Sequence, residues 1–178
     1  MTEEFKVPFP MEFGDYEDAL KMVGEPGPRV VAEFSVNWEM IKIYCSMEED
    51  GNPSFWDEDY ARKQWGGIVA PTGLLLSWAM RLQWQPDKEL DHYFVAMKVP
   101  LPGDTLINVG TTTEFHRHLF LGDRISVEDR LISITEVKKT RLGIGHFLTT
   151  EARFHNQKEE LIAVQTNELF RYYVPETK

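Results

Sequence analysis

The sequence predicts an α+β fold in which one mainly antiparallel sheet wraps around a buried central helix. The C-terminal half contains β-like segments joined by short turns such as "LPGD" and "FLGD", and short turns connect antiparallel neighbours. The segment from about Gly73 to Trp84 has few strongly polar residues, which is typical of a helix buried on most sides. A sheet curved around this helix would bury the apolar surfaces of both elements.

The N-terminal half is predicted to contain one strand and two helices. "RVVAEFSV" (Arg29–Val36) is rich in β-branched residues and follows the breaker run "GEPGP", so we expect a strand. Asn37 can cap a helix through "WEMIKIYCSMEE". "DEDYARKQWG" begins with acidic residues and ends with glycine, which indicates a second, shorter helix.

Five strands are expected after the central helix, because the apolar period changes there from helical to alternating. They are predicted near His92–Val99, Asp104–Phe115, Arg124–Val137, Gly145–Phe154 and Leu161–Phe170. Both faces of the last strand are mixed, as expected for a sheet with a core on one side and a partner on the other. We expect one domain over residues 1–178, with an N-terminal extension (1–28) and a C-terminal tail (171–178).

Composition excludes several classes of function. The net charge of −10 leaves no excess of Lys and Arg to neutralise phosphates, so we expect no nucleic acid partner. No apolar run reaches the roughly eighteen residues of a spanning helix, so we expect no membrane insertion. The acidic N-terminus with Pro8 and Pro10 is unlike a signal peptide, and a single cysteine, Cys45, fits a reducing compartment. These features predict a cytoplasmic protein.

Three motifs resemble those of one known family. "DGNPSFWDEDYA" is similar to the D-x-N-P-x-H-x-D-x-x-x-A loop of the MaoC-like dehydratase and (R)-specific enoyl-CoA hydratase family, whose fold is the hotdog fold. Here Phe55 stands in place of the histidine and Glu49 in place of the preceding glycine. "GGIVAPTGLL" resembles the start of the family's central helix. "TEFHRHLFLGDRISVEDRLISI" is similar to the E-x-H-R-P-x-x-x-G-D stretch of the branch of N-terminal dehydratase domains, with His118 replacing the proline.

The resemblance implies roles for individual residues. Asp50 matches the acid/base aspartate, Asn52 a water-orienting asparagine, and Gly73 the glycine whose N–H stabilises the thioester oxyanion. Thr72 falls on the residue before that glycine. Phe55 occupies the position of the second acid/base, and a phenyl ring cannot move a proton. The resemblance therefore implies a degenerate dyad, without metal or other cofactor, coenzyme A being part of the substrate.

A degenerate hotdog implies a partner, because the family works as a two-hotdog unit. We therefore expect an acyl-binding subunit of a 2-enoyl-CoA hydratase or 3-hydroxyacyl-CoA dehydratase, active in lipid or steroid side-chain metabolism with a catalytic hotdog subunit. One alternative is a homodimeric or larger homo-oligomeric hydratase or thioesterase that pairs Asp50 with His116. Another is a non-enzymatic acyl-CoA or lipid-binding module. His116 and His118 alternate on one strand, but no third ligand completes a metal site.

Overall fold

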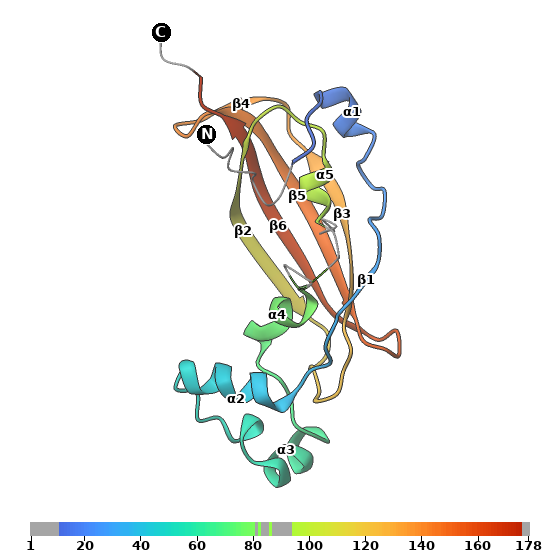
Figure 1. Cartoon of the computed structure of the whole chain (residues 1–178), viewed down its shortest axis with the longest axis vertical. Coiled ribbons are helices and arrows are strands. Elements are labelled where there is room, and N and C mark those ends of the chain that lie inside the picture. The colour runs from blue at the N-terminus through green and yellow to red at the C-terminus, as the bar shows by residue number, and fades with distance from the viewer. Residues whose placement is uncertain (1–10, 81, 83–85, 87–93, 176–178) are drawn as a thin grey trace.

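The fold is built on one long antiparallel sheet, seen in a computed structural model that describes residues 11–80, 82, 86 and 94–175. The strand order is β1-β3-β5-β6-β2, with β4 paired to β5, and every pairing is antiparallel (Figure 1). The strands are β1 (Val30–Val31), β2 (Thr105–Phe115), β3 (Ser126–Ile134), β4 (Lys138–Lys139), β5 (Ile144–His155) and β6 (Leu161–Tyr173). The predicted fold class is confirmed.

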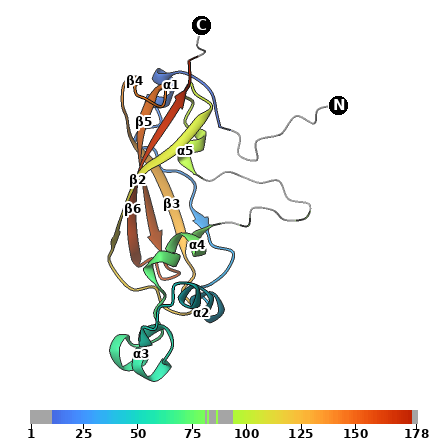
Figure 2. The same ribbon diagram turned by 90° about the vertical axis from the view of Figure 1, so that its left-hand side faces the viewer.

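Within the described residues, five short helices accompany the sheet. They are α1 (Tyr16–Leu20), α2 (Trp38–Met47), α3 (Glu58–Trp65), α4 (Leu75–Ala79) and α5 (Val95–Lys98), with single 3-10 turns at Pro53–Phe55 and Thr72–Leu74. Both α4 and α5 lie against the same face of the sheet, whereas α2 and α3 gather at one end of it (Figures 1 and 2). The predicted caps form, since Asn37 accepts a hydrogen bond from Met40 N–H at 3.0 Å and Gly66 adopts the left-handed conformation after α3.

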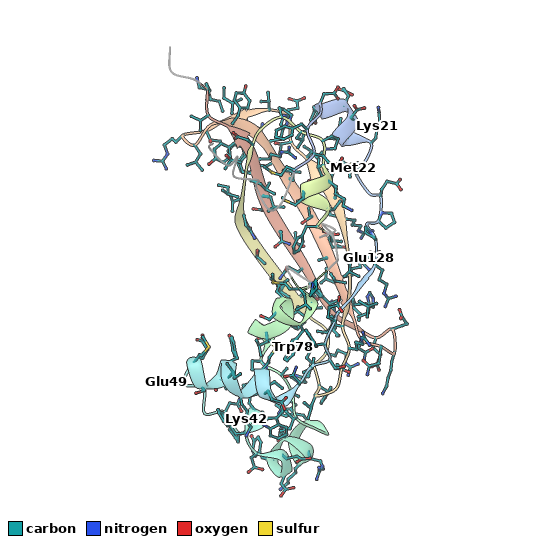
Figure 3. The ribbon with its side chains drawn as sticks, in the orientation of Figure 1. Lys21, Met22, Lys42, Glu49, Trp78 and Glu128 are labelled. Atoms are coloured by element: carbon teal, nitrogen blue, oxygen red, sulfur yellow. The ribbon has the colours of Figure 1, made fainter. Side chains whose placement is uncertain are left out.

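Two apolar clusters fill the face that carries α4 and α5. The first joins α2, α3 and α4 to one end of the sheet, and it includes Ile41, Cys45, Leu74, Trp78, Ile125, Phe154 and Ile162. The second joins α1 and α5 to the other end, and it includes Ala19, Val95, Val99, Leu101, Leu131 and Leu148. Trp78 of α4 lies where the helix meets the sheet (Figure 3). The core is therefore divided along the length of the sheet, with α4 over one part and α5 over the other.

The central helix is shorter than the predicted range of Gly73 to Trp84. It consists of the 3-10 turn Thr72–Leu74 followed by α4, and Met80 is already extended with ψ of 136°. Only Leu75, Trp78 and Ala79 of α4 are buried, whereas Leu76 and Met80 are 42% and 46% exposed. The short helix is therefore buried on the side that packs against the sheet, whereas the side with Leu76 and Met80 is partly exposed.

Two further predicted elements differ from the structure. The strand expected at His92–Val99 lies partly outside the described residues, and its described end is the helix α5. The strand expected at Arg29–Val36 is regular only at Val30 and Val31. Single backbone hydrogen bonds continue beyond it, from Ala32 N–H to Ile125 O and from Val36 N–H to Asp123 O, both at 2.8 Å. Alternation of apolar residues does not distinguish a short buried helical turn from a strand.

The segments that we expected at the two ends of the domain are integrated into it. Ala19 of α1 is fully buried in the second cluster, so the packed domain begins well before residue 29. Strand β6 continues to Tyr173, and Arg171 is fully buried. The predicted tail boundary at residue 171 is therefore wrong by at least three residues, because the strand pairs with both β2 and β5 there.

Candidate functional site

The loop between α2 and α3 is held by its own polar side chains. Asp50 Oδ1 accepts a hydrogen bond from Asn52 N–H, and Asn52 Oδ1 accepts one from Ser54 N–H, both at 3.0 Å. Asp57 Oδ1 caps α3 by accepting a hydrogen bond from Tyr60 N–H at 3.0 Å. Each residue thus has the local role that Asp and Asn side chains commonly have in turns and helix caps. This local bonding explains the loop's shape without requiring that Asp50 be catalytic.

Aromatic side chains fix this loop to α2. Trp56 Nε1 donates a hydrogen bond to the carbonyl oxygen of Asp50 at 2.7 Å, and Asp50 N–H donates to Cys45 O at 2.8 Å. Lys42 Nζ lies 5.0 Å from the ring centroid of Trp38 and 4.9 Å from that of Trp56. Lys42 extends from α2 beside this loop (Figure 3). The Lys42–Trp56 contact joins α2 to the loop, whereas the Lys42–Trp38 contact lies within α2.

Phe55 ends the 3-10 turn and packs against the first apolar cluster. Its ring is half-buried, whereas the neighbouring Asn52 is exposed. A phenyl ring offers neither a donor nor an acceptor for a water molecule. At this position the side chain contributes apolar contact and no acid or base.

Gly73 lies in the 3-10 turn that precedes α4, beside Tyr44 of α2. A Cβ atom on residue 73 would collide with the Tyr44 hydroxyl. Among the described residues, the Tyr44 hydroxyl has no hydrogen-bond partner. The Tyr44 side chain therefore fills the space that a side chain at residue 73 would need, and this close approach requires glycine.

Thr72 and His116 line a small hollow. This hollow has a volume of about 280 Å³, and its wall also includes Phe115, Arg117 and His118. His116 N–H donates to Ile162 O at 2.8 Å, which extends the pairing of β2 with β6. Asp50 does not line this hollow, and no hydrogen bond joins it to His116. The predicted Asp50–His116 pair therefore stays a prediction.

A larger apolar pocket lies on the face of the sheet that carries α4 and α5. It has a volume of about 310 Å³, within the range of small-molecule sites. Helices α4 and α5 form its sides, and β2, β3, β5 and β6 form its floor. The sequence did not predict this pocket, because the expected long central helix would have covered this face.

Asp129 on β3 is an acidic side chain in the lining of the apolar pocket. It is 9% exposed, and its Oδ2 accepts a hydrogen bond from Val95 N–H at 2.8 Å. Burial raises the pKa of Asp129 to about 6, although the bond from Val95 and the charge of Lys98 act in the opposite direction. Buried carboxyl groups with raised pKa values occur preferentially at functional sites. In the sequence, the only signal was an acidic residue on the apolar face of a strand.

A family model described as the FAS1-like dehydratase domain region matches residues 23–165. The chain belongs to this family. The FAS1-like dehydratase region thus includes the candidate loop, the Gly73 turn and most of the sheet.

Two curated relatives extend this assignment. This FAS1-like chain is 31% identical over 175 residues to the probable enoyl-CoA hydratase alpha subunit of Thermomonospora curvata. The aligned region covers 92% of this chain and 54% of the relative. It is 28% identical over 139 residues to the 3-oxo-4,17-pregnadiene-20-carboxyl-CoA hydratase alpha subunit of Mycobacterium tuberculosis, covering 75% of this chain and 45% of the relative. The chain spans about half the length of the curated relatives it matches.

Solved structures share the fold. A chain of the ChsH1-ChsH2 complex from Mycobacterium tuberculosis superposes with a TM-score of 0.75 at 21% identity, covering 90% of this FAS1-like chain and 97% of that chain. The MaoC-like dehydratase from Rhodospirillum rubrum superposes with a TM-score of 0.60 at 24% identity, covering 84% and 94%. These likenesses confirm the predicted hotdog fold.

Within the described ranges, no group of three His, Cys, Asp or Glu side chains is arranged to hold a metal ion. No described helix is long and apolar enough to cross a membrane.

Proposed function

We propose that this chain is the acyl-binding subunit of an (R)-specific 2-enoyl-CoA hydratase, completed by a second hotdog subunit that carries the intact acid/base pair. The observation that carries the proposal is Phe55, whose half-buried ring packs against the first apolar cluster. The same loop retains the motif residues Asp50, Asn52, Pro53, Asp57 and Ala61. The alpha-subunit names of the two curated relatives support an incomplete, paired enzyme.

The reaction is the reversible addition of water across a C=C bond conjugated to a thioester. A base must take a proton from water, an acid must protonate the α-carbon, and donors must stabilise the enolate oxygen. This chain offers Gly73 N–H and the Tyr44 hydroxyl near the start of α4, which could orient a thioester group. At residue 55, where the resemblance implies the second acid/base, it has Phe, which cannot transfer a proton. Proton transfer is therefore assigned to the partner.

An exposed sheet edge offers the surface for such a partner. Strand β2 pairs with β6 on one side, and the other side of this eleven-residue strand has no strand partner within the described residues. Val109 and Phe115 on this strand are 47% and 37% exposed. Long exposed edges invite pairing with another sheet, so a second hotdog subunit could extend this one across β2.

The test is a hydration assay on the purified chain, on its hotdog partner, and on the two co-expressed. Crotonyl-CoA and longer 2-enoyl-CoA thioesters are the substrates. We expect turnover only from the pair, and Asp50→Asn in this chain should change kcat by no more than about threefold, whereas loss of a working acid/base costs about 10²–10⁴. Strong activity of the lone chain that Asp50→Asn abolishes would contradict the proposal. Binding of acyl-CoA without turnover by the pair would instead favour an acyl-CoA-binding module.

A further inference from the structure

We propose that the apolar pocket between α4 and α5 selects an acyl group that carries a hydroxyl at the end remote from its thioester, and that Asp129 accepts the hydrogen bond from that hydroxyl. The inference rests on the proposed function for the thioester end of the ligand. The recognition step itself depends only on residues of this chain.

The position of the pocket fits the remote end of an acyl group. Leu76, Ala79 and Met80 line it, and they follow Gly73 along the same helical segment. The helical rise of 1.5 Å per residue places this wall roughly 5 to 10 Å beyond Gly73. A thioester bound near Gly73 would therefore extend its acyl group along α4 into the pocket.

Strand register gathers polar groups on the pocket floor. Asp129 lies opposite Ala152, and Ala152 lies opposite Gln165, so these three residues form one row across β3, β5 and β6. Thr150 and Asn167 lie opposite each other in the next row. Directly opposed and diagonal neighbours are close enough to contact a single ligand group. The floor thus presents a polar patch inside otherwise apolar walls.

Two of these groups have unused hydrogen-bonding capacity. Asp129 Oδ2 accepts from Val95 N–H, whereas no described residue donates to Oδ1. The Thr150 side chain is buried, and its hydroxyl has no hydrogen-bond partner among the described residues. Gln165 and Asn167 already bond to hydroxyl groups on β2. The unused acceptor and hydroxyl are therefore Asp129 and Thr150.

The chemistry of this patch favours a donor on the ligand. An ionised carboxylate only accepts hydrogen bonds, so it can bind a hydroxyl but not a ketone or an ester oxygen. A purely alkyl group would exclude water from the Asp129 carboxylate without replacing the lost hydrogen bond, which costs binding free energy. The pocket should therefore distinguish ω-hydroxylated from plain acyl chains.

The test is calorimetric titration of the full chain with ω-hydroxydodecanoyl-CoA and with dodecanoyl-CoA, both saturated and unable to react. We expect about tenfold tighter binding of the hydroxylated ligand, the value of one hydrogen bond to a charged group. Asp129→Leu should abolish this preference and tighten binding of dodecanoyl-CoA. Asp129→Asn, which keeps an acceptor for Val95 N–H and a polar group in the pocket, should fold normally and retain part of the preference. Glu128→Gln is the matched control on the opposite face of β3 and should leave both affinities unchanged.

Equal affinity of the wild-type chain for the two ligands would overturn the inference, as would an unchanged preference in Asp129→Leu. Failure of both ligands to bind would overturn it as well. The titration measures binding and requires no turnover. A lack of hydratase activity in the subunit pair would therefore contradict the proposed function, but it would not affect a measured preference for the hydroxylated ligand.

Discussion

The Tyr44 hydroxyl occupies the space where residue 73 would place a side chain, so Tyr44 and Gly73 are sterically matched. This contact joins α2 to the turn before α4. The loop that follows α2 carries Asp50, so the contact also sets the position of the loop relative to that turn. A glycine is therefore required at residue 73 for packing, whether or not its N–H binds a thioester.

Gly73→Ala should destabilise the protein by about 1–3 kcal/mol, because the added methyl overpacks against the Tyr44 hydroxyl. In a Tyr44→Phe background the hydroxyl is gone, and the cost should fall by about 1 kcal/mol. Urea unfolding of the four proteins in this double-mutant cycle measures the coupling. If the changes in unfolding free energy of the two substitutions are additive, the added methyl does not clash with the Tyr44 hydroxyl, and the prediction is wrong.

Replacing Glu49 by Gly should stabilise the protein by about 0.5–1 kcal/mol. Glu49 follows α2 with φ of 53°, in the left-handed region that disfavours side chains. The related family motif has glycine at this position, which fits the backbone. Glu48→Gly is the matched control, since Glu48 has a right-handed φ of −85° and should lose stability on substitution. Thermal unfolding of both variants decides the point, and a loss of stability in both would contradict the prediction.

Arg171→Met should cost about 3 kcal/mol or more. The buried guanidinium donates to Val99 O at 2.7 Å, Gly103 O at 3.1 Å and Glu12 O at 2.5 Å, so its removal leaves three carbonyl groups unpaired. Burial lowers the pKa of Arg171, but the group is expected to stay charged at neutral pH.

Arg153→Met is the control for this substitution. Arg153 is exposed and pairs with Glu151 on the opposite face of the sheet, and such pairs contribute less than about 1 kcal/mol. Denaturant midpoints of the two variants give the comparison, and similar losses would refute the role assigned to Arg171.

Stability should depend on pH through Asp129. Burial raises its pKa from 3.8 to about 6, so the folded protein holds this proton more tightly than the unfolded chain. Its contribution to stability is therefore greatest below pH 4 and is lost as the pH rises to about 6. Among neighbouring charges, Lys98 lowers the pKa and Glu128 raises it.

Asp129→Asn should remove the loss of stability that accompanies ionisation of Asp129, because an amide does not ionise. The variant should gain up to about 3 kcal/mol relative to wild type above pH 6 and show no such gain near pH 4. Unfolding titrations at pH 4, 6 and 7.5 measure the difference. Glu114→Gln is the control, because Glu114 is an exposed carboxyl on β2 that is not among the groups acting on Asp129. A difference that does not change with pH would contradict the raised pKa.

The sequence by itself determined the local structure of the caps, and it shows that residue 55 in the loop is a phenylalanine, which is neither an acid nor a base. Asn37, Asp57 and Gly66 act on backbone groups a few residues away, so their caps could be predicted from residue type and spacing. The motif resemblance predicts that Phe55 stands at a histidine position, whereas the family itself is shown by the model that matches residues 23–165. Such features depend on neighbours in the chain, which the sequence contains directly.

Only the tertiary structure decided how far the central helix extends and what lies beside it. The apolar run after Gly73 is consistent with a long helix, but the chain becomes extended at Met80 and leaves a pocket over β3, β5 and β6. The polar patch around Asp129 depends on the register of three strands that lie far apart in the sequence. Burial, pocket shape and cross-strand neighbours arise from long-range packing, and no local pattern of residues specifies them.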